Sequence, residues 1–141
     1  MKPIHIILAI KERLYSQTIQ MLLETQPGFL VESIVYDEIS AALALKTVLS
    51  RPDPTVDERT VVITAATGVE EIPPAAERWL EEFSGITVVV IDRTSPRVRA
   101  HRRAILACDL AGSAAGFIKS LRGLFSEGLD SFHPLSADDL N

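Results

Sequence analysis

The chain alternates between short apolar runs and longer segments in which apolar residues recur every three or four positions. The most apolar of the short runs is Thr-Val-Val-Ile-Thr-Ala-Ala at 60–66, which follows Asp57-Glu58-Arg59 and precedes Thr67-Gly68. A run without polar alternation is typical of a strand that is buried on both faces. We therefore predict that 60–66 is a central strand of a parallel sheet with helices on both sides.

The same two periodicities order the first ninety residues. They predict strands at 4–9, 29–36 and 86–91, and helices at 14–23, 39–49 and 74–83. Asp37 is expected to cap the second helix, and Pro73-Pro74 suits the start of the third. Strands that alternate with helices favour a parallel, doubly wound sheet, because crossover connections are right-handed. We expect a three-layer α/β/α domain.

Residues 92–110 allow two interpretations. In the first, 93–96 is a turn, 97–102 is a half-solvated antiparallel strand at the sheet edge, and Asp109 caps a last helix that runs from Leu110 to Phe125. In the second, 98–110 is a helix and 115–118 is a short fifth parallel strand. We favour the first interpretation, because it gives the domain a closing helix. The sheet is then mainly parallel with an antiparallel C-terminal edge strand.

Composition fits one domain. The chain has 141 residues, of which 47% are hydrophobic and 23% charged, enough apolar material for a core. We assign residues 1–125 to the domain and the polar residues 126–141 to a tail or linker. Because no apolar run is long enough to span a bilayer, the start lacks a signal-peptide pattern and Cys108 is the single cysteine, we expect a cytoplasmic protein.

Charge is unevenly distributed along the chain. Five arginines against Asp92 give 92–103 a charge of +4, so a net charge of −5 leaves −9 for the remaining residues. On a strand, one face would carry Arg97, Arg99, His101 and Arg103. This face suggests contact with an acidic protein or a second copy of the chain; the alternative is that the charge protects an exposed edge from pairing. Direct nucleic-acid binding is not expected, because no aromatic residues interleave with the arginines.

Several segments of the first half resemble the receiver domain of bacterial response regulators, particularly receivers that precede LuxR-type DNA-binding domains. Ile6-Ile7-Leu8-Ala9 and the helical segment Leu14–Glu24 match the first strand and helix of that family. Pro27-Gly28-Phe29 matches the turn into its second strand, and Thr60–Ala66 its third strand. The resemblance implies a flavodoxin-like fold.

The resemblance also shows which receiver chemistry is missing. The family's Mg²⁺-binding acidic pair falls on Ile10 and Lys11, and its phosphoacceptor Asp falls on Ala65 or Thr64. Its Thr or Ser falls on Asp92, and Lys119 matches its Lys only in the second interpretation. Since an apolar residue and an ammonium do not hold Mg²⁺ and alanine cannot be phosphorylated, we expect no phosphorylation, no metal site and no cofactor.

These observations predict a non-catalytic, phosphorylation-independent regulatory module in bacterial signalling or transcription control. It would act through protein–protein interaction or as a homodimer, with 97–103 or the last helix as the contact surface. The alternative is a small-ligand-binding domain or enzyme that uses the carboxyl edge of the sheet, where Thr64, Thr67 and Asp92 would form a polar pocket.

Overall fold

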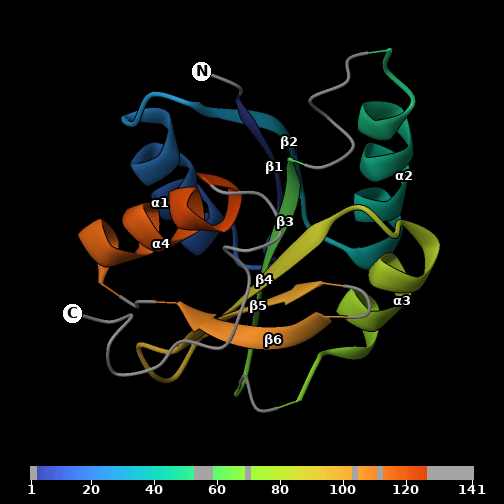
Figure 1. Cartoon of the computed structure of the whole chain (residues 1–141). Coiled ribbons are helices and arrows are strands. Elements are labelled where there is room, and N and C mark those ends of the chain that lie inside the picture. Colours follow the sequence, from blue (N-terminus) through green and yellow to red (C-terminus); the bar gives the residue numbers. More distant parts are fainter. Residues whose placement is uncertain (1–2, 53–58, 69–70, 103–104, 111–112, 127–141) are drawn as a thin grey trace.

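The computed structural model describes residues 3–52, 59–68, 71–102, 105–110 and 113–126, with the backbone alone for 105–110 and Ser126. Its sheet has six strands in the order β2-β1-β3-β4-β5-β6 (Figure 1). The strands are β1 (Ile4–Ala9), β2 (Phe29–Val35), β3 (Thr60–Ala66), β4 (Thr87–Asp92), β5 (Val98–Arg102) and β6 (Ile105–Leu110). The first four are parallel, whereas β5 and β6 pair antiparallel.

Helices cover both faces of this sheet in the described part of the chain. They are α1 (Arg13–Glu24), α2 (Glu38–Leu49), α3 (Pro74–Glu82) and α4 (Ala114–Ser126). Helices α1 and α4 lie on one face, and α2 and α3 lie on the other (Figure 1). The protein is therefore an α/β protein with a mostly parallel sheet between two helical layers, as the alternating pattern predicts.

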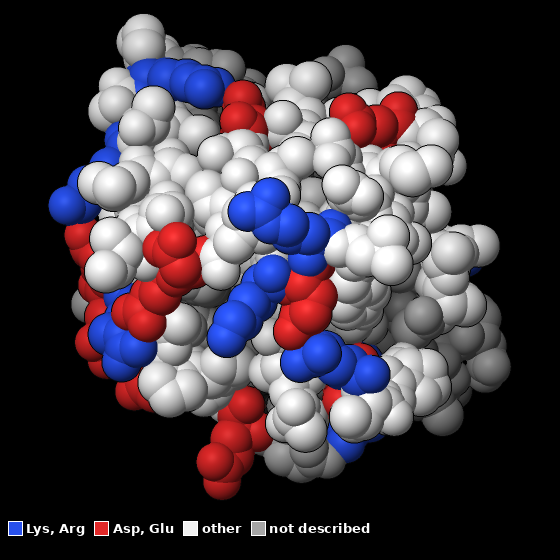
Figure 2. All heavy atoms as spheres, turned by 180° about the vertical axis from the view of Figure 1, so that it is seen from behind, with Lys and Arg blue, Asp and Glu red and all other residues white. Residues whose placement is uncertain are grey.

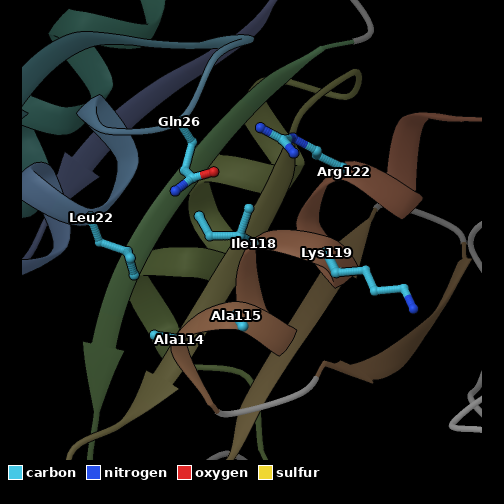
Figure 3. Close-up of a pocket in the computed structure, with 7 residues that line it drawn as sticks. All are labelled: Leu22, Gln26, Ala114, Ala115, Ile118, Lys119 and Arg122. Carbon is cyan, nitrogen blue, oxygen red and sulfur yellow. The ribbon is translucent and has the colours of Figure 1, made fainter.

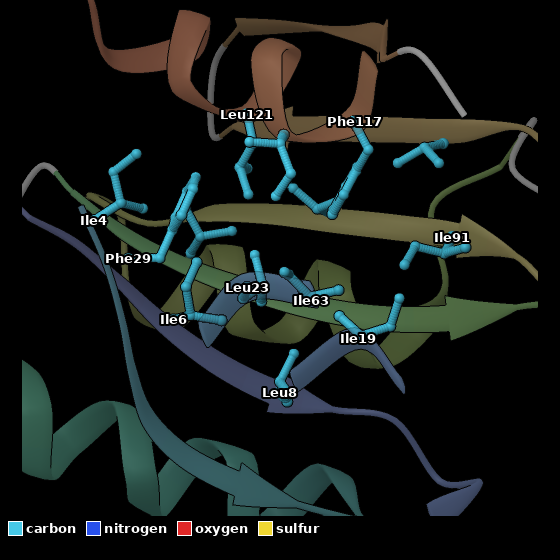
Figure 4. Close-up of a cluster of buried hydrophobic side chains, with 14 of the residues drawn as sticks. Ile4, Ile6, Leu8, Ile19, Leu23, Phe29, Ile63, Ile91, Phe117 and Leu121 are labelled. Atoms are coloured by element: carbon cyan, nitrogen blue, oxygen red, sulfur yellow. The ribbon is translucent and has the colours of Figure 1, made fainter. Parts of the chain in front are cut away.

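The predicted central strand is confirmed. β3 pairs with β1 on one side and β4 on the other, and Val61, Val62 and Ile63 have no exposed area. Val61 and Ile63 pack under α1 and α4, whereas Val62 packs under α2 and α3. Figure 4 shows Phe117 and Leu121 of α4 above the sheet in the first of these clusters. β3 thus links two separate hydrophobic cores.

Local chemistry sets several of the predicted boundaries. The Asp37 carboxylate accepts a hydrogen bond of 2.7 Å from Ser40 N, which caps α2 as expected. Gly28 has a φ of 92° and makes the turn between α1 and β2, a conformation that favours glycine. Pro73 directly precedes α3, and Pro74 is its first residue.

The C-terminal third corrects two predictions. β5 runs antiparallel to β4, as in the first interpretation, but it is not the edge strand because β6 pairs with its other side. The second interpretation is wrong, since 98–102 and 105–110 are strands and 115–118 lies within α4. The run Ile-Leu-Ala-Cys-Asp-Leu forms strand β6. Its pairing with β5 satisfies backbone N–H and C=O groups of β5 that would otherwise have no strand partner.

The start of the last helix also differs from the prediction. Asp109 lies in β6, where its backbone is opposite Arg99, so it does not cap α4. Instead, Ser113 Oγ accepts a hydrogen bond of 3.2 Å from Gly116 N at the start of the helix. α4 therefore begins at Ala114 and not at Leu110. Of the predicted tail 126–141, Ser126 belongs to α4 and 127–141 lies outside the described residues.

Candidate functional site

Asp92 is the central polar group at the carboxyl edge of the parallel strands. It is the last residue of β4 and is 7% exposed. Its carboxylate accepts hydrogen bonds from Ser95 Oγ (2.7 Å), Thr94 Oγ1 (2.8 Å), Thr94 N (2.9 Å) and Gly68 N (3.2 Å). The bonds from Ser95 and Thr94 hold the pKa of Asp92 well below its ordinary value. The ionised Asp92 carboxylate thus connects the turn after β4 to the loop after β3 through hydrogen bonds.

A second carboxylate at this edge is held by an ion pair. Glu12 Oε1, just before α1, lies 2.9 Å from Arg93 Nη1, and Arg93 N donates to Ala66 O at 2.9 Å. Burial raises the pKa of Tyr15, and the charges of Arg93, Asp92 and Glu12 also act on this phenol. These contacts join the segments that follow β1, β3 and β4.

Ile10, Lys11, Ala65 and Thr64, which the sequence comparison singled out, lie near the carboxyl ends of β1 and β3. Ile10 is fully buried at the end of β1, Lys11 is exposed, and Ala65 is half-buried opposite Ile91. The Thr64 hydroxyl donates to Ala9 O at 2.8 Å and so links β3 to β1. This edge of the sheet therefore presents an apolar residue and an ammonium directly after β1.

The predicted ligand residues are close in the fold but have separate partners. Thr64 bonds Ala9, Asp92 bonds the residues of its own turn and Gly68, and Thr67 is exposed. Among the described residues, no hydrogen bond joins Thr64, Thr67 and Asp92 to one another. The carboxylate that would have bound a ligand already accepts four hydrogen bonds, three at Oδ1 and one at Oδ2.

The predicted basic face has a mixed outcome. Arg97 is exposed just before β5, Arg99 is half-buried, and His101 is only 8% exposed, while Arg103 lies outside the described residues. Arg99 and His101 share one face of the sheet, opposite Val90 and Val88 of β4. Because β5 is an inner strand, these side chains do not form the solvated edge that the sequence suggested. Figure 2 shows Lys and Arg side chains beside Asp and Glu side chains on the face seen from behind.

Two further arginines, which the sequence did not single out, hold the end of α4. Arg102 donates to Leu124 O at 3.1 Å and to Thr87 Oγ1 at 2.8 Å, and Arg59 donates to Phe125 O at 3.4 Å. Each guanidinium carbon lies 5.2 Å from the centre of the Phe125 ring. Cations at a helix C-terminus stabilise its free carbonyl groups, so this pair fixes α4 against the sheet.

At the amino end of the sheet, the buried His5 belongs to a polar cluster with the half-buried Glu32 and the exposed Arg51. His5 Nδ1 lies 2.6 Å from Glu32 Oε2, and Arg51 Nη1 lies 2.8 Å from the same oxygen. Glu32 sits at the irregularity of the β1–β2 pairing, where the register shifts between Ile6 and Ile7. Burial raises the pKa of Glu32, but the bonds with His5 and Arg51 outweigh burial and hold this pKa below its ordinary value. Through Glu32, the cluster connects Arg51, just after α2, to strands β1 and β2.

A groove of about 500 Å³ lies between α1 and α4 (Figure 3). Leu22 and Gln26 line it from the α1 side, and Ala114, Ala115, Ile118, Lys119 and Arg122 line it from α4. Its lining is mixed: Leu22, Ile118 and two alanines are apolar, Gln26 is polar, and both charged residues are cationic. Ala114, Ala115 and Lys119 are exposed. Arg122 donates to Pro27 O at 2.8 Å and closes one end. This hollow is a candidate contact surface.

Comparison with known proteins gives no match to the chain, whether with models of protein families, with curated proteins or with solved structures. Within the described residues, no group of three or more His, Cys, Asp or Glu side chains is arranged to hold a metal ion. None of the described helices has the length and apolar character needed to cross a membrane. The fold therefore defines the class of the protein, an α/β protein with a mostly parallel sheet. The evidence for its function lies in the carboxyl edge of the sheet and in the groove between α1 and α4.

Proposed function

We propose that this chain is a flavodoxin-like, receiver-like regulatory domain that does not use phosphoryl transfer and acts by binding a protein partner in bacterial signalling or transcription control. The first support is topological. The parallel strands follow the order β2-β1-β3-β4, which is the order of the flavodoxin-like fold over its first four strands. The antiparallel β5 and β6 depart from that fold and extend the sheet beyond β4.

The observation that carries the proposal is the state of the two carboxylates at the carboxyl edge. In this fold class, ligands and reacting groups bind at that edge. Here Asp92 accepts hydrogen bonds from Ser95, Thr94 and Gly68, and Glu12 is paired with Arg93. Both groups hold loops together, so binding a cation or attacking a phosphoryl group would compete with these contacts.

The groove between α1 and α4 is the best-supported contact surface, in agreement with the expected role of the last helix. Leu22, Ala114, Ala115 and Ile118 provide an apolar floor, and Lys119 adds an exposed positive charge at the rim. A partner segment with apolar side chains flanked by carboxylates complements this surface. The basic residues Arg97 and Arg99 are a weaker candidate, because Arg99 is half-buried within the sheet.

A small-ligand site at Thr64, Thr67 and Asp92 is less well supported. The oxygens of Asp92 are engaged by the turn and loop around them, and Thr64 bonds the Ala9 carbonyl. A ligand there would compete with the intramolecular hydrogen bonds that already stabilise this charged group.

Site-specific photo-cross-linking tests the proposed surface. A photoreactive residue at Ala115 in the source cells should capture one protein whose purified form then binds the chain in solution. The same residue at Glu81, exposed on α3 in the opposite helical layer and outside α2, is the matched control. Ala115→Glu should weaken binding of the purified partner at least about tenfold. Equal capture at both positions, or unchanged binding by Ala115→Glu, would refute the groove as the contact surface.

A further inference from the structure

Helix α2 differs from an ordinary surface helix because apolar residues occur on all its sides. Eight of its twelve residues are Ala, Ile, Leu or Val. Only Ala41, Leu45 and Val48 are fully buried against the sheet. A helix that is apolar all round is typically covered on more than one side, whereas a surface helix carries polar residues outward. The outward side of α2 is therefore only partly polar: Lys46 and Thr47 are exposed in its second half, whereas Ile39 and Leu43 are exposed in its first half.

Two large side chains form a ridge on that outward side. Ile39 is 74% exposed and Leu43 is 59% exposed. They are four residues apart, so they lie one turn apart on the same face of the helix. Ala42 lies beside them and is half-buried, so its small side chain leaves room for a neighbouring helix next to the ridge. Leu14 and Met21 on α1 are equally exposed, but they are seven residues apart, with the exposed polar residues Gln17 and Thr18 between them.

Charges stand at the two ends of the α2 ridge and differ in sign. Asp37 and Glu38 are at the amino end, where the Glu38 carboxylate forms a two-pronged ion pair with Arg78 of α3. Lys46 is in the last turn, 62% exposed and 3.6 Å from Glu82. The helix macrodipole adds positive character to the amino end and negative character to the carboxyl end. Two such helices are complementary when they run antiparallel.

We propose that α2 is a homodimer interface, with a second copy of this chain as its occupant. Two α2 helices related by a two-fold axis at the level of residue 41, midway between Ile39 and Leu43, place Ile39 of each copy against Leu43 of the other. The same arrangement directs Lys46 of each copy towards the acidic amino end of the other α2. A two-fold interface needs one self-complementary patch, and α2 supplies one in shape and in charge.

The size of the ridge sets the expected strength of the dimer. A helix of twelve residues is about 18 Å long, so one helix-to-helix contact falls at the small end of specific interfaces. Such small interfaces are typical of weak, reversible complexes. We expect a monomer–dimer equilibrium with a dissociation constant of roughly 10 to 100 µM. The inference is independent of the α1–α4 groove, because α2 lies on the opposite helical layer.

Sedimentation velocity of the full chain from about 5 µM to about 500 µM tests the proposal, since this range brackets the expected equilibrium. The native chain should shift from monomer to dimer, and Leu43→Glu and Ile39→Glu should each remain monomeric over the range. Met21→Glu is the matched control, because it adds the same charge at an equally exposed apolar position on α1. Far-UV circular dichroism checks that each variant is folded.

A cross-linking experiment gives an independent readout. A short bis-maleimide should link two copies of Leu43→Cys, made with the single native cysteine changed by Cys108→Ser, and should not link Met21→Cys in the same background. Absence of a dimer up to the highest concentration would overturn the proposal. So would a dimer that survives Leu43→Glu, or one that is lost in Met21→Glu.

Discussion

Truncation of Leu121 to alanine tests how firmly α4 is packed on the sheet. Leu121 is fully buried in the cluster that joins α4 to α1 and to the strands β1, β3 and β4. Removing a fully buried leucine side chain loses its transfer free energy and leaves a cavity, which together cost about 2 to 5 kcal/mol. Since domains of this size have stabilities of about 5 to 15 kcal/mol, Leu121→Ala should fold but lose a large share of its stability.

Urea unfolding measures this loss. Far-UV circular dichroism follows all the helices, and fluorescence follows Trp79, the single tryptophan, which belongs to α3 and is buried in the opposite core. Coincident transitions by the two probes would indicate that both cores unfold together. A loss of about 3 kcal/mol corresponds to a fall in melting temperature of roughly 10 °C for a chain of this length.

Lys119→Ala is the matched control for Leu121→Ala. It lies on the same helix, is exposed, and gains a similar helix propensity from alanine. We expect its stability to change by less than about 0.5 kcal/mol. A loss below about 1 kcal/mol in Leu121→Ala, or equal losses in the two variants, would refute the packing of α4 that forms the groove.

Three further predictions concern charge and backbone. The folded-state pKa values of Asp92 and Glu32 are lowered, so their stabilising effect is complete above their unfolded values of about 4 and lost as the pH falls further. Melting temperatures from pH 7 to about pH 3 should therefore fall less steeply for Asp92→Asn than for the native chain. Gly123→Ala should stabilise the chain by about 0.5 to 1 kcal/mol in the same urea assay, because an added Cβ in this helix meets no atom within 4 Å. Gly28→Ala should destabilise the chain, because residue 28 has a φ of 92°, which alanine adopts only with strain. Arg102→Lys should cost about 1 kcal/mol in that assay, because lysine cannot donate to Leu124 O and Thr87 in the same geometry.

Most of the fold follows from local sequence chemistry. The β-branched run of β3 predicts a doubly buried strand because it carries no charged residue and no polar alternation. Asp37 and Gly28 mark boundaries through capping and a left-handed turn. β6 could not be assigned in the same way. Its six residues fit either a strand or the start of a helix, and only pairing with β5 decides between them. The error at Asp109 has the same origin, because an acid before an apolar run is also a capping signal.

Within the candidate site, contacts between neighbouring residues could be predicted from the sequence, whereas contacts between distant residues could not. Thr94 and Ser95 lie two and three residues after Asp92, so a local turn that supplies three of its four hydrogen bonds is encoded within four residues. The pair of Glu12 with Arg93 joins residues that are distant in sequence, and no periodicity predicts it. The contacts of Arg59 and Arg102 with Phe125 could not be predicted from the sequence either, because these residues meet only when α4 packs on the sheet.

The central claim is that this receiver-like scaffold works without phosphoryl transfer, and intact-protein mass spectrometry after incubation with a small phosphodonor and Mg²⁺ tests it most directly. A receiver that retains its acidic residues, treated in the same way, is the positive control. We predict an unchanged mass for this chain, because Ala65 has no nucleophile and Asp92 and Glu12 are engaged by their own loops. A stable phosphoryl adduct that Asp92→Asn or Glu12→Gln abolishes would contradict the account.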